Sequence, residues 1–354
     1  MTDIFLDSLT ELAVGVNTSI SASIARTRLL NFMTAKWTRD PMRYRFEGVR
    51  GLPTLERSAR APRIIMDKTQ LAVDGLVDLR DILFPFVCSI DAAPTVTDPD
   101  SSDDDIKLVT FQPAINQYPA IKYAGIERVS SDADETATQR AYSAQRGFCM
   151  GWSLSEGDGV YNISSNWQLG AESGPEARTA SLTEPETPVI LPMSECTFQI
   201  YDTWAAMVAG TPAESDTLSY GLEFVSGHSI RNRMDGRQDY SKEDGAAGRM
   251  LDFTATAYVE SALTELVLAE EGKFEDTRYM KIRFEAGEEV KAGYPYFLEI
   301  GMACTHADDS LVERDDEGEE GRNTRRLHLQ SGGDDANGLF FRVQLHKDDH
   351  DAYL

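Results

Sequence analysis

Apolar and polar positions alternate most regularly between residues 249 and 303. The alternation over 249–258 predicts a strand with one buried face. The period then lengthens, and apolar residues at i, i+3, i+4, i+7 and i+8 predict a short helix over 259–272, which ends at a glycine. Alternation returns over 279–285 and over 294–303. The pattern therefore predicts a unit of strand, helix, strand and strand.

The same order of elements is predicted in the first half of the chain. A strand over 63–71 precedes a helix over 75–84 that Pro85 stops, and two further strands follow over 106–112 and 120–129. The two predicted helices begin about half the chain apart. We expect a duplicated unit, and the alternative is two unrelated α+β segments that share common patterns.

The chain has 354 residues, which is long enough for two domains with separate cores. We expect an N-terminal arm over 1–40, containing a helix over 19–34 that docks on its own domain or on a neighbouring subunit. A first β domain then covers 41–210 and a second covers 211–354. The predicted fold class is mainly β, with each domain a β-sandwich or small barrel flanked by one short helix.

The clearest hairpin lies over 148–170, with its turn at Asp158-Gly159. Its return strand places Tyr161, Ile163, Ser165, Trp167 and Leu169 on one face, and Asn162, Ser164, Asn166 and Gln168 on the other. A face of small, uncharged polar groups is unusual in so acidic a chain. Residues 171–192, rich in Pro, Glu and Thr, are expected to form an extended connector.

The formal net charge is −25, and the chain has 9 Lys against 25 Arg. An acidic surface with few lysines is typical of proteins from concentrated salt, where screening weakens self-repulsion. We therefore expect a halophilic source, although the acid could instead belong to one functional surface. The acidic loop over 98–105 and the highly charged stretches over 235–248 and 308–320 are expected to be loops exposed to solvent.

No catalytic or ligand-binding motif stands out. The chain lacks the dinucleotide, P-loop, nucleophile-elbow and HExxH patterns. His346 and His350 have helical metal spacing, but they follow a predicted strand, and the 98–105 loop lacks the glycine and the closing glutamate of an EF-hand. We therefore predict no catalytic, cofactor-binding or metal residues, no cofactor and no enzymatic activity, with a hydrolase of unidentified carboxylates as the least favoured alternative.

Three further features of the sequence limit the class of protein: the spacing of the cysteines, the length of apolar runs and the distribution of basic residues. The cysteines are scattered and form no CxxC pair, so buried reduced thiols are expected at Cys88, Cys149, Cys196 and Cys304. Neither a secretory leader nor a run of about 20 apolar residues is present, so we expect no membrane insertion. Basic residues form no stripe with interleaved aromatics, which disfavours tight nucleic-acid binding.

The order of elements resembles the tail tube proteins of long-tailed bacteriophages and related archaeal viruses. The resemblance rests on the strand, the short amphipathic helix, and the strand Thr277-Arg278-Tyr279-Met280-Lys281-Ile282-Arg283-Phe284, which a long charged loop precedes. It covers most of 41–347 as a pattern of elements, and no single motif in it is diagnostic. It implies β-sandwich or barrel domains whose sheets join side by side into a ring.

The resemblance implies a structural virion protein that is assembled in the host cytoplasm. Two domains per chain imply trimeric, pseudo-hexameric rings, stacked as a tube through which double-stranded DNA passes. The implied partners are further copies of the chain and the tail terminator, tape-measure and baseplate or distal tail proteins. The alternatives are a β-rich receptor- or carbohydrate-binding surface protein, and the inner tube of a contractile tail or secretion apparatus.

Overall fold

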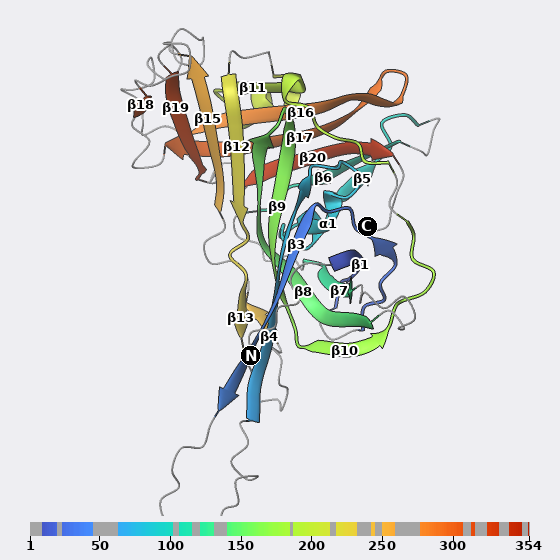
Figure 1. Cartoon of the computed structure of the whole chain (residues 1–354). Helices are drawn as coiled ribbons and strands as arrows, with labels where there is room; N and C mark the ends of the chain where they lie inside the picture. Colours follow the sequence, from blue (N-terminus) through green and yellow to red (C-terminus); the bar gives the residue numbers. More distant parts are fainter. Residues whose placement is uncertain are drawn as a thin grey trace, which may run out of the picture.

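The computed structural model describes residues 9–19, 23–44, 63–101, 106–114, 121–130, 140–184, 187–212, 217–231, 242–244, 250–258, 277–306, 313–315, 324–332, 340–348 and 353. The fold is mainly β, as predicted, and hydrogen bonds join eighteen of the described strands into one continuous, folded sheet. Figure 1 shows two layers whose strands cross at a steep angle, with a smaller group of strands beneath them.

The first layer is a long sheet in the order β3, β4, β9, β8, β12, β15 and β19. Its strands are β3 (Thr34–Tyr44), β4 (Arg63–Leu76), β9 (Val160–Leu169), β8 (Arg140–Gly157), β12 (Thr217–Val225), β15 (Met250–Tyr258) and β19 (Thr324–Ser331). The short strand β18 (Glu313–Asp315) pairs with β19, and a separate two-stranded ladder joins β13 (Ser229–Arg231) to β14 (Lys242–Asp244).

The second layer has the order β5, β6, β20, β17, β16 and β11. Its strands are β5 (Thr95–Thr97), β6 (Ile106–Phe111), β20 (Phe341–Asp348), β17 (Tyr294–His306), β16 (Arg278–Lys291) and β11 (Cys196–Tyr201). A third group has the order β2 (Arg28–Leu29), β1 (Leu9–Asn17), β7 (Tyr123–Ser130), β8 and β10 (Glu172–Ala177).

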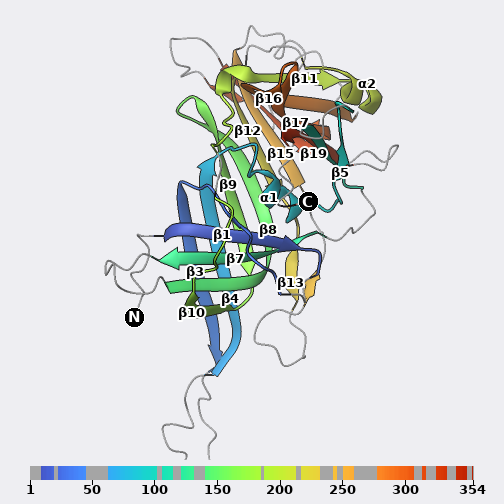
Figure 2. The ribbon, with the colours of Figure 1, turned by 90° about the vertical axis from the view of Figure 1, so that its right-hand side faces the viewer.

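Strand β8 belongs to two of these groups. Its first half pairs with β7 and β10, and its second half pairs with β9 and β12. The change of partners coincides with a register shift against β7 and with Arg146, whose φ of 61° is left-handed. A bulge of this kind bends a strand and allows it to leave one sheet for another. Figure 2 shows the bent strand connecting the long sheet to the lower group.

The core lies between the two layers and contains the aromatic rings. Ring centroids lie 4.8 Å apart for Tyr161 and Phe284, and 5.4 Å apart for Phe224 and Phe341, so β9 and β12 pack on β16 and β20. The short helix α1 (Leu83–Val87) is buried along its whole length. Its Phe84 stacks on Trp167 of β9 at 4.6 Å. The helix therefore fills part of the interior.

Strands β3 and β4 form a long antiparallel ribbon that projects beyond the body in Figure 1. They pair from Thr34 with Asp74 to Tyr44 with Arg63. Among the described strands β3 pairs with β4 alone, so its other edge faces no described strand. Such an edge is available to a further strand.

The predicted strands over 63–71, 106–112, 120–129, 279–285 and 294–303 are confirmed. So are the strand over 249–258 and the hairpin of β8 and β9, where Asp158 and Gly159 have φ values of 50° and 82°. Positive φ at both central residues is the signature of a type I′ turn. The helix expected over 259–272 lies outside the described residues.

The helix expected over 75–84 is wrong. Strand β4 continues to Leu76, since it pairs with β3 on one side and β9 on the other. Asp78 then orders a turn, with its Oδ1 accepting the Arg80 N–H at 3.0 Å, and α1 begins only at Leu83. Pro85 falls in the first turn of α1, where the missing N–H is not needed. It therefore does not stop the helix.

The arm expected over 1–40 is also wrong where the structure describes it. Leu12 and Val14 of β1 are fully buried members of the core. The described part of the helix expected over 19–34 is extended and holds β2, because the Leu30 N–H donates to the Leu12 carbonyl at 2.9 Å and the Leu29 N–H to the Thr183 carbonyl at 3.0 Å. Tertiary hydrogen bonds override a helical pattern here.

Among the described strands, the two halves do not pair alike, contrary to the expected duplication. Strands β16 and β17 form a hairpin, whereas their expected counterparts β6 and β7 pair with other strands. Pairing also crosses the predicted boundary at 210/211, between β8 and β12 and between β6 and β20. One hydrophobic core cluster contains residues from both predicted domains. The boundary therefore divides residues that pack together.

Candidate functional site: the polar face of the long sheet

The long sheet turns one face to the core and the other away from it. We call the second face the polar face and define it by its described side chains: Thr34, Lys36 and Thr38 of β3; Gln70, Ala72, Asp74 and Leu76 of β4; Val160, Asn162, Ser164 and Asn166 of β9; Met150, Ser153 and Ser155 of β8; Gly221, Glu223 and Val225 of β12; Met250, Asp252 and Thr254 of β15; and His328 and Gln330 of β19. It runs across seven strands.

Register aligns these residues in rows across the strands. One row contains Thr34, Asp74, Ser164, Ser153, Glu223, Asp252 and Gln330, each opposite the next. The neighbouring row on the other face contains Ala35, Val73, Ser165, Trp152, Phe224 and Leu251. Because side chains alternate along each strand, one register fixes both rows. A slip of one residue would bury the polar row.

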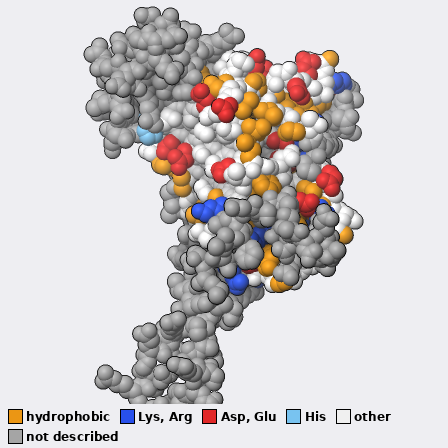
Figure 3. All heavy atoms as spheres, viewed as in Figure 1, with side chains coloured by type: hydrophobic (Ala, Val, Ile, Leu, Met, Phe, Trp, Pro, Cys, Tyr) orange, Lys and Arg blue, Asp and Glu red, His pale blue; other side chains and the backbone are white. Residues whose placement is uncertain are grey.

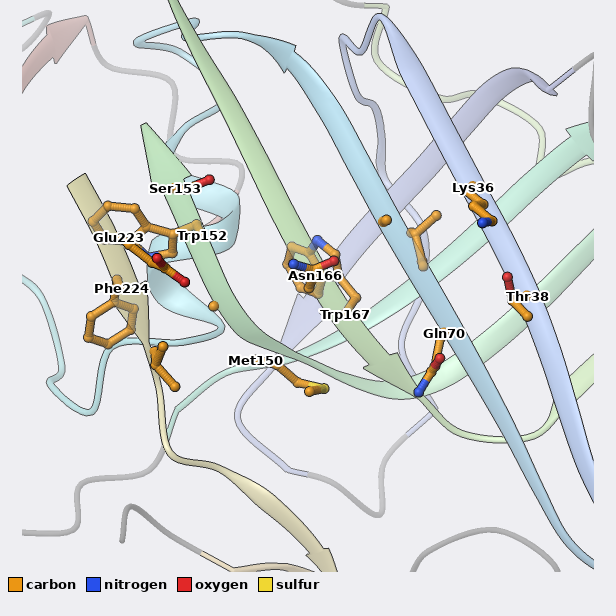
Figure 4. Close-up of a pocket in the computed structure, with 14 residues that line it drawn as sticks. Lys36, Thr38, Gln70, Met150, Trp152, Ser153, Asn166, Trp167, Glu223 and Phe224 are labelled. Carbon is orange, nitrogen blue, oxygen red and sulfur yellow. The ribbon is translucent and has the colours of Figure 1, made fainter. Parts of the chain in front are cut away.

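The polar face is hollowed between β3 and β12. The hollow has a volume of about 450 Å³ and reaches from Lys36 and Thr38, across Gln70 and Asn166, to Glu223. Figure 4 shows Lys36 and Thr38 on one side of it and Glu223 on the other. Trp152 and Trp167 border it from beneath, and both are 2 % exposed because they belong to the core. The lining of the hollow is therefore mixed, because polar side chains alternate there with Ala72, Met150 and Val225 above the buried rings.

Charge is sparse on this face. Among its described side chains, Lys36 is the one Lys or Arg, and Asp74, Glu223 and Asp252 are the acids. Asp74 accepts a hydrogen bond of 3.2 Å from the Thr34 hydroxyl. Most of the other polar side chains are amides and hydroxyls, which exchange hydrogen bonds with water readily, and apolar side chains such as Met150 and Val225 lie between them. Such a surface attracts a polyanion weakly, since phosphate binding depends on clustered Lys and Arg.

A second polar cluster lies on the outer side of β16, β17 and β20. Glu299 faces Lys281 at 3.0 Å and lies 3.6 Å from Arg283. The Lys281 ammonium also donates to the Gly210 carbonyl at 2.8 Å, after the end of the short helix α2 (Trp204–Ala209). Burial lowers the pKa of Lys281, and Glu299 opposes this shift. Enclosed in this way beneath α2, Lys281 anchors the helix to β16.

The predicted thiols and histidines add no reactive group. All four cysteines are free, and burial raises the pKa of Cys149, Cys196 and Cys304 to about 12, so the reactive thiolate is disfavoured. His346 lies within β20, and His350 lies outside the described residues. Among the described residues no group of three or more His, Cys, Asp or Glu is placed to hold a metal ion.

Sequence reasoning identified only one strand of the polar face. The alternation of Asn162, Ser164 and Asn166 in β9 indicated it, and the structure adds β3, β4, β8, β12, β15 and β19. The alternation in Thr34, Lys36 and Thr38 carried the same signal, but the expected arm and its helix obscured it. Within the described residues, no helix is long and apolar enough to cross a membrane. No family model matches the chain, and no curated protein matches it.

Proposed function

We propose that the chain is a structural subunit of the tail tube of a long-tailed virus, and that its polar face lines the channel through which double-stranded DNA passes. The observation that carries the proposal is the polar face itself, which extends over seven strands with one basic side chain described on it. A tube wall must touch DNA without holding it, and a hydrated surface with little positive charge meets that demand.

The edges of the sheet support self-association. The described part of β3 has one edge that faces no described strand, and the ribbon of β3 and β4 projects beyond the body (Figure 1). An isolated two-stranded ribbon is marginally stable in water, so a ribbon of this length is better suited to packing on a neighbour. The proposed partners are further copies of the chain in a closed ring, and the proteins that end and measure a tail. The trimer that the resemblance implied depended on two separate domains per chain, and the shared core removes that basis.

The wall of a DNA channel should also lack metal-binding and reactive groups. Among the described residues there is no candidate metal cluster; Cys88, Cys149 and Cys304 are buried, whereas Cys196, expected to be buried, is only partly so. A carbohydrate-binding surface, the main alternative, presents exposed aromatic rings on which sugars stack. The described side chains of the polar face include no Phe, Tyr or Trp. This favours the tube over a sugar-binding role.

Electron microscopy of the protein purified in molar salt tests the assembly. Rings or stacked tubes are expected, and the mass of one ring divided by the 39.3 kDa of one chain gives the number of chains that it contains. Discrete monomers under all salt conditions would contradict the tube.

Charge variants test which face lines the channel. Gln70→Lys with Asn166→Lys adds two cations to the hollow, and assembled tubes should then retain a short labelled DNA duplex in a manner that falls with added salt. The matched control, Ala205→Lys with Ala209→Lys, adds the same charge to exposed positions of α2. Equal retention by both variants would contradict a channel-lining polar face.

A further inference from the structure

The side chain of Tyr353 is fully buried, although it follows the last strand of the fold by five residues. Its ring lies 5.3 Å from the ring of Phe84 in α1, and the guanidinium of Arg28 lies 5.8 Å from its centroid. Its backbone carbonyl accepts a hydrogen bond of 2.9 Å from the Lys122 ammonium. One residue thus contacts β2, α1 and the segment before β7.

The polar contacts around Tyr353 are long for buried groups. The Tyr353 hydroxyl donates to Asp81 Oδ1 at 3.4 Å, and Arg28 Nη2 lies 3.3 Å from the same oxygen. Arg28 is 3 % exposed, and its Nε has no hydrogen-bond partner among the described residues. Burial raises the pKa of Asp81 in spite of Arg28, so the carboxylate is poorly compensated. Buried charges that are incompletely paired favour a hydrated alternative.

A second buried carboxylate, that of Glu127, is well paired, in contrast to Asp81. Glu127 is 1 % exposed and receives Arg26 Nη2 at 2.9 Å, the Thr179 N–H at 2.9 Å and the Thr179 hydroxyl at 2.6 Å. These bonds lower the pKa of Glu127 against the effect of its burial. The segment around Arg26 and Arg28 is therefore held firmly at Glu127 and weakly at Asp81.

We infer that Arg28, Asp81, Phe84 and Lys122 form a binding site for a tyrosyl side chain, which the chain's own Tyr353 occupies as a releasable plug. Phe84 supplies the apolar wall, Asp81 accepts from the phenol, and Lys122 binds the backbone. When Tyr353 leaves the site, water can hydrate the charged groups of Arg28 and Asp81. The vacated site can then accept another tyrosyl group.

Hydrogen exchange on the full chain tests release. The Asn31 N–H donates to Asp81 and the Thr179 N–H to Glu127, so two amides bonded to buried carboxylates can be compared in one sample. Asn31 should exchange at least about tenfold faster, because opening at Asp81 needs only local rearrangement. Equal or slower exchange at Asn31 would overturn the releasable character of the plug.

Adding the C-terminal residues as a separate peptide tests whether the site recognises a tyrosyl side chain. A chain shortened after Asp348 should exchange faster at Asn31, with β7 unaffected, and a synthetic peptide of residues 349–354 should reverse the change. The same peptide carrying Tyr353→Ser should not. If the shortened chain folds only with peptide present, the tyrosine peptide alone should support folding. Identical behaviour with both peptides, or no change on shortening, would overturn the site.

In the full chain, Tyr353→Phe keeps the ring and removes the hydroxyl. It should raise exchange at Asn31 less than Tyr353→Ala does, because Phe84 still packs on the ring. Equal exchange in the two variants would mean that the ring contributes nothing and would contradict a site built for a tyrosyl group.

Discussion

In this fold, the packing on each face of a strand decides whether a side chain is buried or available to bind a ligand. His346 illustrates the point, because the sequence places it beside His350 as a conceivable metal pair and the structure buries it in β20. Its ring stacks on Phe297 with a centroid distance of 5.1 Å, and its Nδ1 contacts the Pro295 carbonyl. Periodicity alone cannot distinguish a histidine that packs from one that binds, because both occupy the same strand position.

The environment of His346 predicts an acid-sensitive stability. Burial lowers the pKa of His346, the Pro295 contact opposes the shift, and Arg283 adds to it. The unfolded chain then binds a proton more readily than the folded one, so the free energy of unfolding should fall as pH falls below about 6.5. The loss can approach about 1.4 kcal/mol for each unit by which the two pKa values differ.

Urea denaturation between pH 7.5 and pH 5 measures this effect. His346→Gln, which stays neutral, should flatten the dependence of the unfolding free energy on pH in that window. His328→Gln on the polar face is the control, because its side chain is partly exposed. If the slope were unchanged in His346→Gln and reduced in His328→Gln, the acid sensitivity would come from His328, and the prediction for His346 would be wrong.

At the scale of elements, α2 shows how a short helix is fixed to a sheet. It has six residues, and Trp204 and Met207 are its buried side chains. The Thr203 hydroxyl caps its start by accepting the Ala206 N–H at 3.1 Å, and Lys281 binds the Gly210 carbonyl after its end. So short a helix forms because of these contacts rather than by propensity.

Gly301 of β17 makes room for α2, which predicts a cost for any side chain there. A Cβ on Gly301 would lie 2.8 Å from Met207 Sδ and 2.9 Å from its Cε, so Met207 must move. We expect Gly301→Ala to lower the free energy of unfolding by about 1 kcal/mol, the low end for overpacking, because the flexible end of the Met207 side chain can yield. Urea denaturation measures the change.

A double-mutant cycle identifies the source of the cost. Met207→Ala should remove most of the effect of Gly301→Ala, so the two changes should be non-additive by about 0.5 kcal/mol or more. Gly332→Ala is the matched control, because its Cβ would meet Thr305 at 3.4 Å, an ordinary contact. Strictly additive losses would show that α2 does not press on Gly301.

Local patterns predicted the elements well and their assembly poorly. The strands over 249–258 and 294–303 and the Asp158-Gly159 turn follow from alternation and turn chemistry, which are local. The helix over 75–84 and the arm over 1–40 failed because pairing with β9 and burial against β7 involve residues distant in sequence. The polar face was incompletely predicted for the same reason, since its rows exist only once five or more strands are in register.

At the scale of the whole molecule, the charge of −25 sets the conditions for assembly. Some of the acid is compensated in the fold. Asp98 pairs with Lys107 at 2.7 Å and Asp100 with Lys291 at 3.1 Å, which the sequence had not indicated for the 98–105 loop. The remaining charge still repels between copies at low salt, where the Debye length is about 30 Å at 0.01 M.

We therefore predict that assembled tubes are stable in molar salt and dissociate as salt is removed. At 1 M the Debye length falls to about 3 Å, and apolar burial between copies can dominate. Light scattering during dialysis from molar to millimolar salt measures the midpoint, which is the salt concentration at which half of the tubes have dissociated. Neutralising the acids over 308–320 to Asn and Gln should move that midpoint to lower salt.

The pairs at Asp98 and Asp100 supply the control for the salt prediction. Asp98→Asn with Asp100→Asn also removes two negative charges, but it leaves Lys107 and Lys291 without these partners. Its effect on the midpoint should be smaller than that of an equal number of neutralised acids over 308–320. Tubes that survive dialysis into millimolar salt would mean that the acid is no adaptation to salt.

The pairing of β4 on both sides has a mechanical consequence. Hydrogen bonds of an antiparallel ladder lie across the strands, so a pull along β4 loads the Thr69–Leu76 ladder to β9 in shear. Bonds loaded in shear share the force and rupture together, whereas a pull across the sheet would open them one after another. The projecting ribbon is thus anchored in the direction in which a ladder is strongest. A neighbour that grips the ribbon can transmit tension along its axis into the body without unzipping the sheet.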